Sequence, residues 1–298
     1  MSKAGAPFFR TTLPIGTIGD LLAGCTSMLE SEGVAEPQRE AREIVAAVLD
    51  VPKFWAAANA VSDASPDVAR SVIRAAMKRA GGAPLAYAVG RASFRHLTLE
   101  VDERVLIPRV ETEVLVERVL ERCTSKTRVV ADIGTGSGAI ALSLAFEREF
   151  ERVIATDISL DAIAVAGANA ASMRHGLQSP VELRVGSLLA PLAGEKVDAI
   201  VSNPPYISFA EIVDLPADVR DWEPSLALLC PQDGLSVTRE LVRRAPSVLA
   251  RGGMLALEVD TRRSGTVMEM IAVDGRFAEI EVLLDLTGRE RFVFARRV

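Results

Sequence analysis

The sequence contains few residues of the kinds that form disulfides or bind transition metals. It has three cysteines and two histidines in 298 residues. Cys25, Cys123 and Cys230 are odd in number and widely spaced, which favours buried, reduced thiols over a disulfide framework or a cysteine-based metal site. We therefore expect no bound metal, and we assign neither histidine a role as a catalytic base.

Long apolar runs are also missing. No run approaches the roughly 18 to 20 residues that a membrane-spanning helix needs, although 49% of the residues are hydrophobic and can fill a large core. The N-terminal stretch MSKAGAPFFRTTLP lacks the charged-then-apolar layout of a secretory signal. These features predict a globular, cytoplasmic protein without membrane contacts, and we expect it to be a monomer.

An excess of positive charge is absent as well. The formal net charge is −6, which argues against stable nucleic-acid binding, because Lys and Arg supply most of the affinity for a phosphate backbone. Residues 70–109 depart from this average with eight bases against three acids. That segment is either a solvated helix face or a docking patch for a macromolecule, and the sequence leaves both interpretations open.

Helical patterns occupy the N-terminal part of the chain. Residues 17–33, 36–50 and 65–82 have helical spacing of apolar residues, with Ser65 as an N-cap and Pro66 in the first turn. We predict a small helical domain over residues 1–83. A connector over residues 84–105, containing a short hairpin, joins it to a second domain over residues 106–298.

Strand-like and helical segments alternate through the rest of the chain. This alternation predicts a mostly parallel sheet with helices on both faces, and the last two strand-like runs, separated by LTGR, predict an antiparallel hairpin at one sheet edge. The fold class is therefore α/β, a Rossmann-like mixed sheet preceded by a small all-helical domain. The expected strands are residues 127–134, 151–158, 181–186, 196–203, 252–259, 277–285 and 290–298.

A glycine-rich loop follows the first of these strands. VVADIGTGSG ends that strand and begins its helix, and glycines there let the backbone approach a ligand closely. Asp157 ends the next strand, where a carboxylate can accept hydrogen bonds from both ribose hydroxyls. The spacing D-x-G-x-G-x-G resembles the cofactor loop of class I methyltransferases and favours S-adenosylmethionine over a dinucleotide. The predicted cofactor-binding residues here are Asp132, Gly134, Thr135, Gly136, Ser137, Gly138 and Asp157.

A second motif, NPPY, follows a strand at the same expected edge of the sheet. Asn203 and Pro204 each precede a proline, which holds their carbonyl groups in extended backbone, and the Asn203 side chain supplies another acceptor. Convergent acceptors beside a methyl donor suit a planar –NH₂ group, and the Tyr206 ring can pack on that group. Asn203, Pro204, Pro205 and Tyr206 are therefore the predicted catalytic and substrate-binding residues, with Asn203 also beside the cofactor. Glutamine, adenine and cytosine all carry such a group.

Several further segments resemble one family, the glutamine methyltransferases that modify class I peptide chain release factors. The matching segments are PLAY, LIPRVETE, DIGTGSGAIALSLA, ATD, VSNPPYI, VRDWEPSLAL, DGL and DLTGRERFV. The resemblance implies methyl transfer from S-adenosylmethionine, leaving S-adenosylhomocysteine, to the glutamine of the release factor's Gly-Gly-Gln motif, with the helical domain over residues 1–83 docking this substrate onto the catalytic domain over residues 106–298. It also implies that Arg109 and Glu111, just before the first catalytic helix, shape the substrate cleft, the alternative being a structural ion pair. Trp222, Glu223 and Pro224 either cover the site or have a packing role.

Three segments depart from the family pattern. Val110 stands where a proline is common, and Ser187 and Leu188 stand where an acidic-aromatic pair is expected near the adenine. LEVDTRR lacks the glycine and glutamine often found after its glutamate, so we expect Asp260 and Thr261 to alter the local turn. We still assign Ser187 and Leu188 to the cofactor site. The alternatives are methylation of a ribosomal-protein glutamine, methylation of a nucleic-acid amino group, and a non-catalytic scaffold that keeps the fold.

Overall fold

The computed structural model describes residues 16–298 of the protein. It divides into two compact units, one ending at Val89 and one from Gly90 to Val298, and each is described by itself. The N-terminal stretch that we interpreted as non-secretory lies outside the described residues. Within the described part, no helix is long and apolar enough to cross a membrane.

Within residues 16–89 the first unit consists of helices and the loops that join them, with one isolated β-bridge between Thr17 and Asp63. Thr17 caps its first helix through a reciprocal pair of hydrogen bonds with Asp20. Ser65 accepts a hydrogen bond from Val68 N and Pro66 follows it in the first turn, so the predicted helix start is confirmed. The apolar faces enclose one core that contains Leu21. The helices of this unit are α1 (Ile18–Ser31), α2 (Pro37–Leu49), α3 (Trp55–Ala58), α4 (Pro66–Ala80) and α5 (Leu85–Val89).

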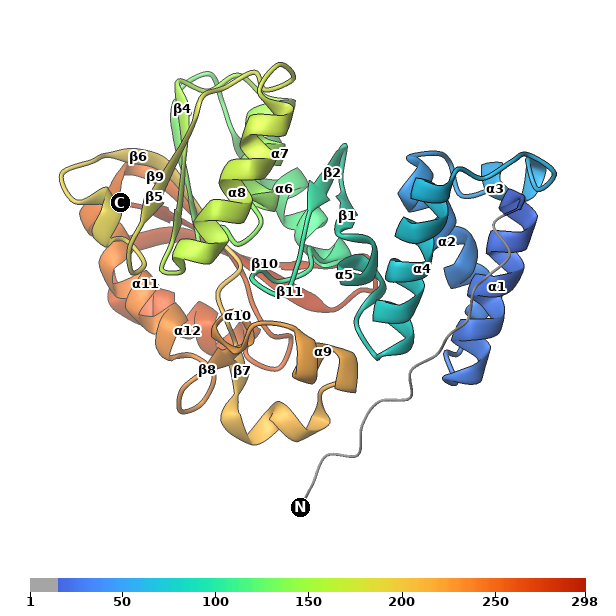
Figure 1. The fold of residues 1–298 in the computed structure, drawn as a ribbon. Helices are drawn as coiled ribbons and strands as arrows, with labels where there is room; N and C mark the ends of the chain where they lie inside the picture. The colour runs from blue at the N-terminus through green and yellow to red at the C-terminus, as the bar shows by residue number, and fades with distance from the viewer. Residues whose placement is uncertain (1–15) are drawn as a thin grey trace. The chain divides into compact units, whose positions relative to one another are not determined.

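The second unit is built on a seven-stranded mixed sheet (Figure 1). The strand order is β10-β11-β9-β6-β3-β4-β5, in which β9, β6, β3, β4 and β5 run parallel and β11 is antiparallel to both of its neighbours. The predicted α/β fold with an antiparallel hairpin at one edge is confirmed. The strands are β3 (Val129–Ile133), β4 (Arg152–Asp157), β5 (Val181–Val185), β6 (Val197–Ser202), β9 (Leu249–Glu258), β10 (Phe277–Leu284) and β11 (Glu290–Arg297).

Helices cover both faces of this sheet. In Figure 1, α6, α7 and α8 lie on one side of it, and α11 and α12 lie on the other. Leu241 and Ile271 of the latter pair join the buried core with the strand residues Ile133 and Ile200. The helices are α6 (Val110–Arg122), α7 (Ala139–Glu147), α8 (Leu160–Met173), α11 (Ser236–Val248) and α12 (Ser264–Asp274).

Shorter elements lie around the sheet. A separate hairpin pairs β1 (Arg91–Phe94) with β2 (Leu97–Glu100), as the connector pattern predicts. Between β6 and α11 the chain forms a series of short strands and short helices that the periodicity did not predict. They are β7 (Ile207–Ser208), η2 (Phe209–Asp214), α9 (Ala217–Trp222), α10 (Ser225–Leu228) and β8 (Leu229–Cys230), and a further turn, η1 (Ala190–Leu192), follows β5.

The parallel register brings the two predicted motifs to one edge of the sheet. Ile133 pairs with Ser202 on one side and with Thr156 on the other, and Ser202 pairs with Leu257. The residues that follow these strands therefore meet at the carboxyl ends of the strands, where ligands bind in open α/β sheets. The three cysteines are free and buried, as expected.

Candidate active site

The glycine-rich loop turns sharply between β3 and α7. Gly134 and Gly136 have φ values of 75° and 55°, and a Cβ on either would meet no atom within 4 Å. Glycine is therefore required there by the left-handed backbone rather than by crowding. The Gly136 N–H donates to Asp157 Oδ2 at 2.9 Å, which joins the loop to the end of β4.

Asp132 lies behind this loop and is fully buried. Its Oδ2 accepts hydrogen bonds from Thr135 Oγ1 at 2.6 Å and from Ala141 N at 3.1 Å, while Oδ1 has no partner among the described residues. Burial raises the pKa of Asp132 to about 7 against the effect of these two hydrogen bonds. Asp132 does not line the adjoining cavity, and neither do Thr135, Ser137 and Gly138. Asp132 is placed to hold the shape of the loop.

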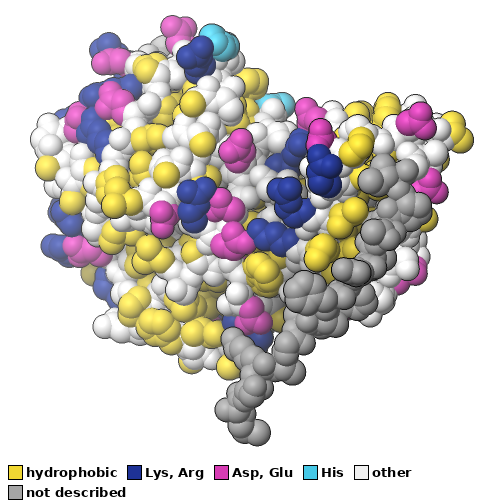
Figure 2. Space-filling model, viewed as in Figure 1, with side chains coloured by type: hydrophobic (Ala, Val, Ile, Leu, Met, Phe, Trp, Pro, Cys, Tyr) yellow, Lys and Arg dark blue, Asp and Glu magenta, His cyan; other side chains and the backbone are white. Residues whose placement is uncertain are grey.

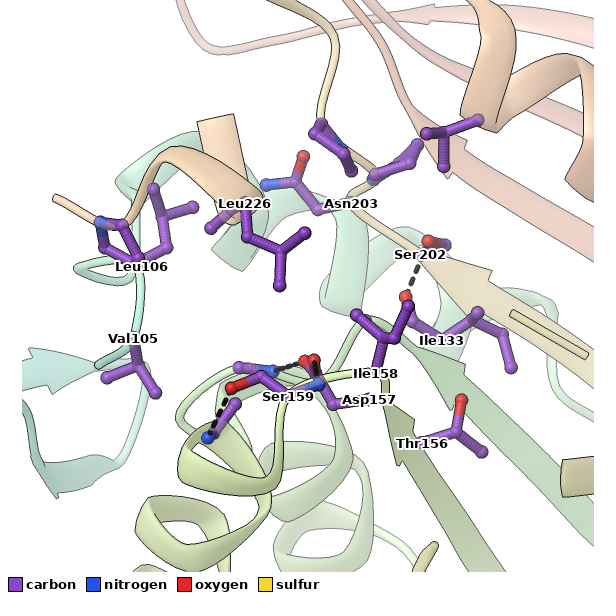
Figure 3. Close-up of a pocket in the computed structure, with 18 of the residues that line it drawn as sticks. Val105, Leu106, Ile133, Thr156, Asp157, Ile158, Ser159, Ser202, Asn203 and Leu226 are labelled. Carbon is purple, nitrogen blue, oxygen red and sulfur yellow. Dashed lines mark hydrogen bonds between the residues drawn. The ribbon is translucent and has the colours of Figure 1, made fainter. Parts of the chain in front are cut away.

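A cavity of about 260 Å³ opens in front of the loop (Figure 3). Asp157 lines it, and its Oδ1 accepts a hydrogen bond from Ser159 N at 2.9 Å. Ser187 and Leu188 also line it, and Leu188 holds an unusual left-handed backbone with φ of 50°. The side chain of Leu226, 57% exposed, extends into the cavity from α10 in Figure 3. The cavity thus combines a carboxylate, the glycine backbone and apolar walls.

The NPPY residues separate this cavity from a second one. Asn203, Pro204 and Pro205 line the first cavity and also a neighbouring cavity of about 280 Å³. Tyr206 and Arg109 line the second cavity alone, together with Leu215, Pro216 and Val219 from the short turns after β7. A group held against Asn203 is therefore accessible from both cavities.

The Asn203 side chain is anchored by a buried hydrogen-bond chain. Asn203 Nδ2 donates to Thr112 Oγ1 at 3.1 Å, and Thr112 Oγ1 donates to Glu258 Oε2 at 2.7 Å. Thr112 and Glu258 are 5% and 1% exposed. Burial raises the pKa of Glu258 to about 7, and the Thr112 hydrogen bond opposes this shift. Because Nδ2 is used by Thr112, the Asn203 Oδ1 is the atom left to accept a hydrogen bond from a ligand.

Tyr206 is held by its backbone as well as by its ring. A Cβ on Gly234 would lie 2.4 Å from the Tyr206 carbonyl oxygen, and Gly234 has φ of 80°. The DGL segment therefore needs glycine so that the chain after the prolines can pass close to it. Burial raises the pKa of the Tyr206 hydroxyl to about 12, so the ring is neutral at physiological pH.

Arg109 and Glu111 have different places. Arg109 is the N-cap of α6 and its Nη2 donates to Glu223 Oε1 at 2.5 Å, and Glu223 Oε2 accepts from Ile107 N at 3.3 Å. Glu111 lies within the first turn of α6 and lines neither cavity. Glu223, rather than Glu111, is the partner of Arg109, and the pair ties the segment before α6 to the turn between α9 and α10. Pro224 lines the first cavity and Trp222 lines neither.

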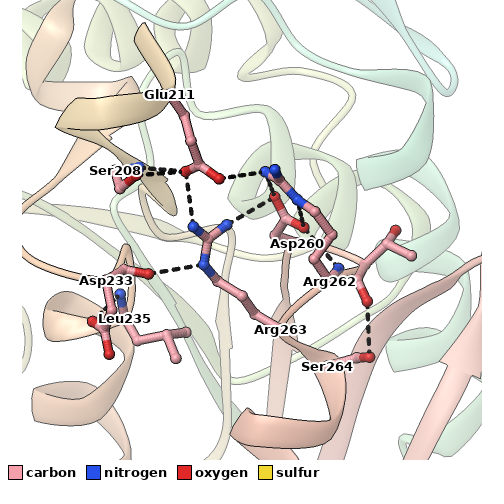
Figure 4. Close-up of polar contacts among 9 residues, drawn as sticks. Ser208, Glu211, Asp233, Leu235, Asp260, Arg262, Arg263 and Ser264 are labelled. Carbon is pink, nitrogen blue, oxygen red and sulfur yellow. Dashed lines mark hydrogen bonds and ion pairs between the residues drawn. The ribbon is translucent and has the colours of Figure 1, made fainter. Parts of the chain in front are cut away.

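An ion-pair cluster holds the segment after NPPY against the loop after β9 (Figure 4). Glu211 Oε2 accepts from Ser208 N and from Arg263 Nη2, each at 2.8 Å. Arg263 Nη1 donates to Asp260 Oδ2 at 3.0 Å, and Arg262 Nη2 bridges Glu211 and Asp260. Asp260, where the family pattern has a small residue, is thus a partner of two arginines in this cluster.

The basic segment at residues 70–109 is largely neutralised. At least five of its eight bases form ion pairs, each within its own unit: Arg70 with Asp67, Arg79 with Glu40, Arg95 with Glu147, Arg104 with Asp102 and Arg109 with Glu223. Figure 2 likewise shows acidic and basic side chains interspersed on the face it presents. Arg79 and Arg95 are largely buried with their acidic partners, so the segment is not simply a solvated helix face, and a docking patch stays a prediction.

Thr112, Glu258 and Leu226 are site residues that the sequence reasoning missed. Thr112 lies in the quoted segment LIPRVETE and Leu226 in VRDWEPSLAL, but nothing in the spacing joins Thr112 to Glu258, which is 146 positions away. The sequence did contain one signal for Glu258. It is a charged residue that directly follows the apolar residues LAL of an expected strand, and a charge in such a buried position needs a partner.

Comparison with known proteins places this geometry in a family. Residues 20–90 match the PrmC N-terminal domain model and residues 110–214 match the methyltransferase small domain model. A release factor glutamine methyltransferase of Moorella thermoacetica is 42% identical over 94% of this chain and 99% of its own length. The corresponding protein of Deinococcus radiodurans is 39% identical over 93% and 98%. The chain belongs to the release factor glutamine methyltransferase family.

A solved structure has the same fold as this family member. The catalytic domain of hMettl16, solved in complex with the MAT2A 3'UTR hairpin 6, covers 78% of this chain and 82% of its own with a TM-score of 0.53 and 15% identity. That likeness shows the class I methyltransferase fold. The domain models and the curated relatives confirm the predicted family and enzyme class, whereas the individual roles of the site residues stay predictions.

Proposed function

We propose that this protein transfers a methyl group from S-adenosylmethionine to the side-chain amide nitrogen of the glutamine in the Gly-Gly-Gln motif of class I peptide chain release factors. The observation that carries the proposal is the Asn203 Oδ1, which lacks a protein donor among the described residues and stands in the wall shared by two cavities. The release factor assignment is supported by the names of relatives that align over nearly the whole chain.

The first cavity suits S-adenosylmethionine. Asp157 offers a carboxylate for ribose hydroxyls, the loop at Gly134 and Gly136 lets the backbone approach a ligand, and Ile158 and Leu188 supply apolar walls for a base. When bound, the cofactor supplies an electrophilic sulfonium methyl group. These residues would hold it so that the methyl group faces the NPPY wall.

The second cavity suits a glutamine side chain. The Asn203 Oδ1 and the Pro204 carbonyl oxygen are acceptors beside this wall, and a primary amide offers two N–H donors. Accepting both hydrogens orients the amide nitrogen, whose lone pair is otherwise delocalised into the carbonyl group. Tyr206 packs beside the planar group and excludes water, and the proton lost from nitrogen leaves to solvent. The contribution of the protein is orientation and desolvation.

The test is mass spectrometry of the organism's own class I release factors after incubation with the protein and S-adenosylmethionine. We expect one added methyl group on the Gly-Gly-Gln glutamine, lost with Asn203→Ala. The control variant is Arg243→Ala, an exposed residue of α11 paired with Glu240, and we expect it to retain full methylation.

Calorimetry with S-adenosylmethionine separates the ways in which the proposal can fail. Cofactor binding without any methylated release factor would overturn the substrate and direct the search to ribosomal-protein glutamines and nucleic-acid amino groups. Absence of both binding and methylation would overturn the assignment of enzymatic activity in favour of a scaffold.

A further inference from the structure

A buried chain of three side chains fixes how the Asn203 carboxamide lies. Its members come from three distant segments: Asn203 follows β6, Thr112 lies in the first turn of α6, and Glu258 ends β9. They are joined by hydrogen bonds of 3.1 Å and 2.7 Å. The carboxamide of an asparagine has two ends of nearly equal shape, and only its hydrogen-bond partners decide which end faces a ligand.

The direction of this chain follows from the charge at its far end. An ionised carboxylate can only accept, so Glu258 obliges the Thr112 hydroxyl to donate to it. The Thr112 oxygen then has lone pairs to offer Asn203, and only Nδ2 can donate to them. The Asn203 oxygen is consequently directed away from Thr112.

We propose that Glu258 is a positioning residue that acts through Thr112 to direct the Asn203 oxygen, rather than its nitrogen, toward the amide nitrogen to be methylated. This inference rests on the proposed function, since the reversed carboxamide would present a donor to a substrate –NH₂ group that is itself a donor. Neither Glu258 nor Thr112 lines either cavity, so both act through Asn203.

The same chain makes the arrangement sensitive to pH. A protonated Glu258 can donate to Thr112, which removes the constraint on the direction of the chain. The charged and titratable groups that act on Glu258 are Arg291 from β11, Arg109 and Glu111 at the start of α6, and Tyr206 after β6. Asp260, two residues after Glu258, acts on Tyr206. The two arginines favour the ionised carboxylate and Glu111 opposes it, while burial holds the pKa of Glu258 at about 7.

Steady-state kinetics with saturating S-adenosylmethionine and a release factor provide the first test. Thr112→Val removes the hydroxyl at nearly constant volume, and we expect kcat to fall about 10- to 100-fold while the cofactor KM stays unchanged. Thr112→Ser keeps the hydroxyl and is expected to retain kcat within about threefold. Equal kcat values for the valine and serine variants would overturn the proposal.

The pH profile provides the second test. We expect the kcat of the native protein to rise through about pH 7 as Glu258 ionises. Glu258→Gln, whose amide can both donate and accept, is expected to give a low kcat without that ionisation. An unchanged rise in the Glu258→Gln variant would contradict the proposal. If Glu258→Gln shows no thermal unfolding transition, it is not folded, and the comparison of Thr112→Val with Thr112→Ser then decides whether the proposal holds.

A measurement without turnover keeps this inference separate from the proposed function. The side-chain ¹⁵N–¹H signals of Asn203 are identified by their loss in Asn203→Ala. We expect them to shift with pH around 7 in the native protein and to stay fixed in Glu258→Gln. If the native protein methylates no release factor, the proposed function fails while these signals still decide the orientation of Asn203. Signals that do not respond to pH in the native protein would overturn the positioning role.

Discussion

The active site contains two buried carboxylates that serve different motifs. Asp132 lies behind the glycine-rich loop and Glu258 lies behind NPPY, and burial raises the pKa of each to about 7. Asp132 is bonded to residues three and nine positions away, whereas Glu258 is bonded to Thr112, 146 positions away. The hydrogen bonds of Asp132 are thus local in the sequence, whereas the hydrogen bond of Glu258 is long-range.

The largest effect that we expect from replacing one of these carboxylates is on the pH dependence of the free energy of unfolding. Burial raises the pKa of Glu258 from 4.5 to about 7, so the folded state binds its proton more tightly than the unfolded state does. The contribution of Glu258 to the stability of the folded state is fully present below about pH 4.5 and is lost as the pH rises through about 7. We expect the free energy of unfolding, relative to Glu258→Gln, to fall by about 3 kcal/mol between about pH 4 and 8.

Urea unfolding at a series of pH values measures this difference. Asp132→Asn provides the same comparison for the cofactor side, and we expect the same sign, because burial also raises the pKa of Asp132. A difference that stays constant with pH would show that the carboxylate is solvated in the folded protein.

The next effect concerns which kinetic constant each carboxylate controls. Asp132→Asn keeps one oxygen for the Thr135 and Ala141 donors and places an –NH₂ donor at the Oδ1 position, where the native oxygen accepts no hydrogen bond from the described residues. We expect cofactor Kd to rise about 10- to 50-fold by calorimetry, while kcat at saturating cofactor stays within about threefold. Glu258→Gln should show the reverse pattern. An equal loss of kcat in Asp132→Asn and Glu258→Gln would show that the two carboxylates do not control different kinetic constants.

A smaller effect is expected from the ion-pair cluster after NPPY. Arg263→Met keeps much of the side-chain volume but removes the bonds to Glu211, Asp260 and the Asp233 carbonyl oxygen. We expect faster proteolysis within residues 207–222 and a release factor KM raised about three- to tenfold, with cofactor Kd unchanged. Arg243→Met, whose partner Glu240 lies on an exposed helix face, is the control and should behave as the native protein.

The smallest effect is a gain in stability at the start of α6. Val110 is 63% exposed in the first helical position, and Arg109 before it already has extended backbone, with φ of −100° and ψ of 147°. Proline is compatible with both conditions. We expect Val110→Pro to raise the free energy of unfolding by about 0.5–1 kcal/mol in urea titration. A loss of stability would show that the Val110 N–H has a partner that proline removes.

Much of the fold could be predicted because its signals are local. The alternation of strands and helices gave the parallel sheet, and the Ser65 cap and the terminal hairpin are set by residues close to one another in the chain. The segment between Ile207 and Cys230 could not be predicted, because its short turns are held by distant partners, Glu211 by Arg263 and Glu223 by Arg109. Local periodicity contains no information about such partners.

The sequence by itself determined the fold class, the family resemblance, the glycine-rich loop with Asp157, and NPPY. These follow from backbone preferences of glycine and proline and from the apolar pattern, which act over a few residues. Only the tertiary structure decided that Asp132 holds the loop from behind, that Arg109 pairs with Glu223, and that Glu258 is joined to Asn203 through Thr112. Those contacts depend on strand register and burial, because a side chain reaches a distant partner only when the packed sheet brings the two together.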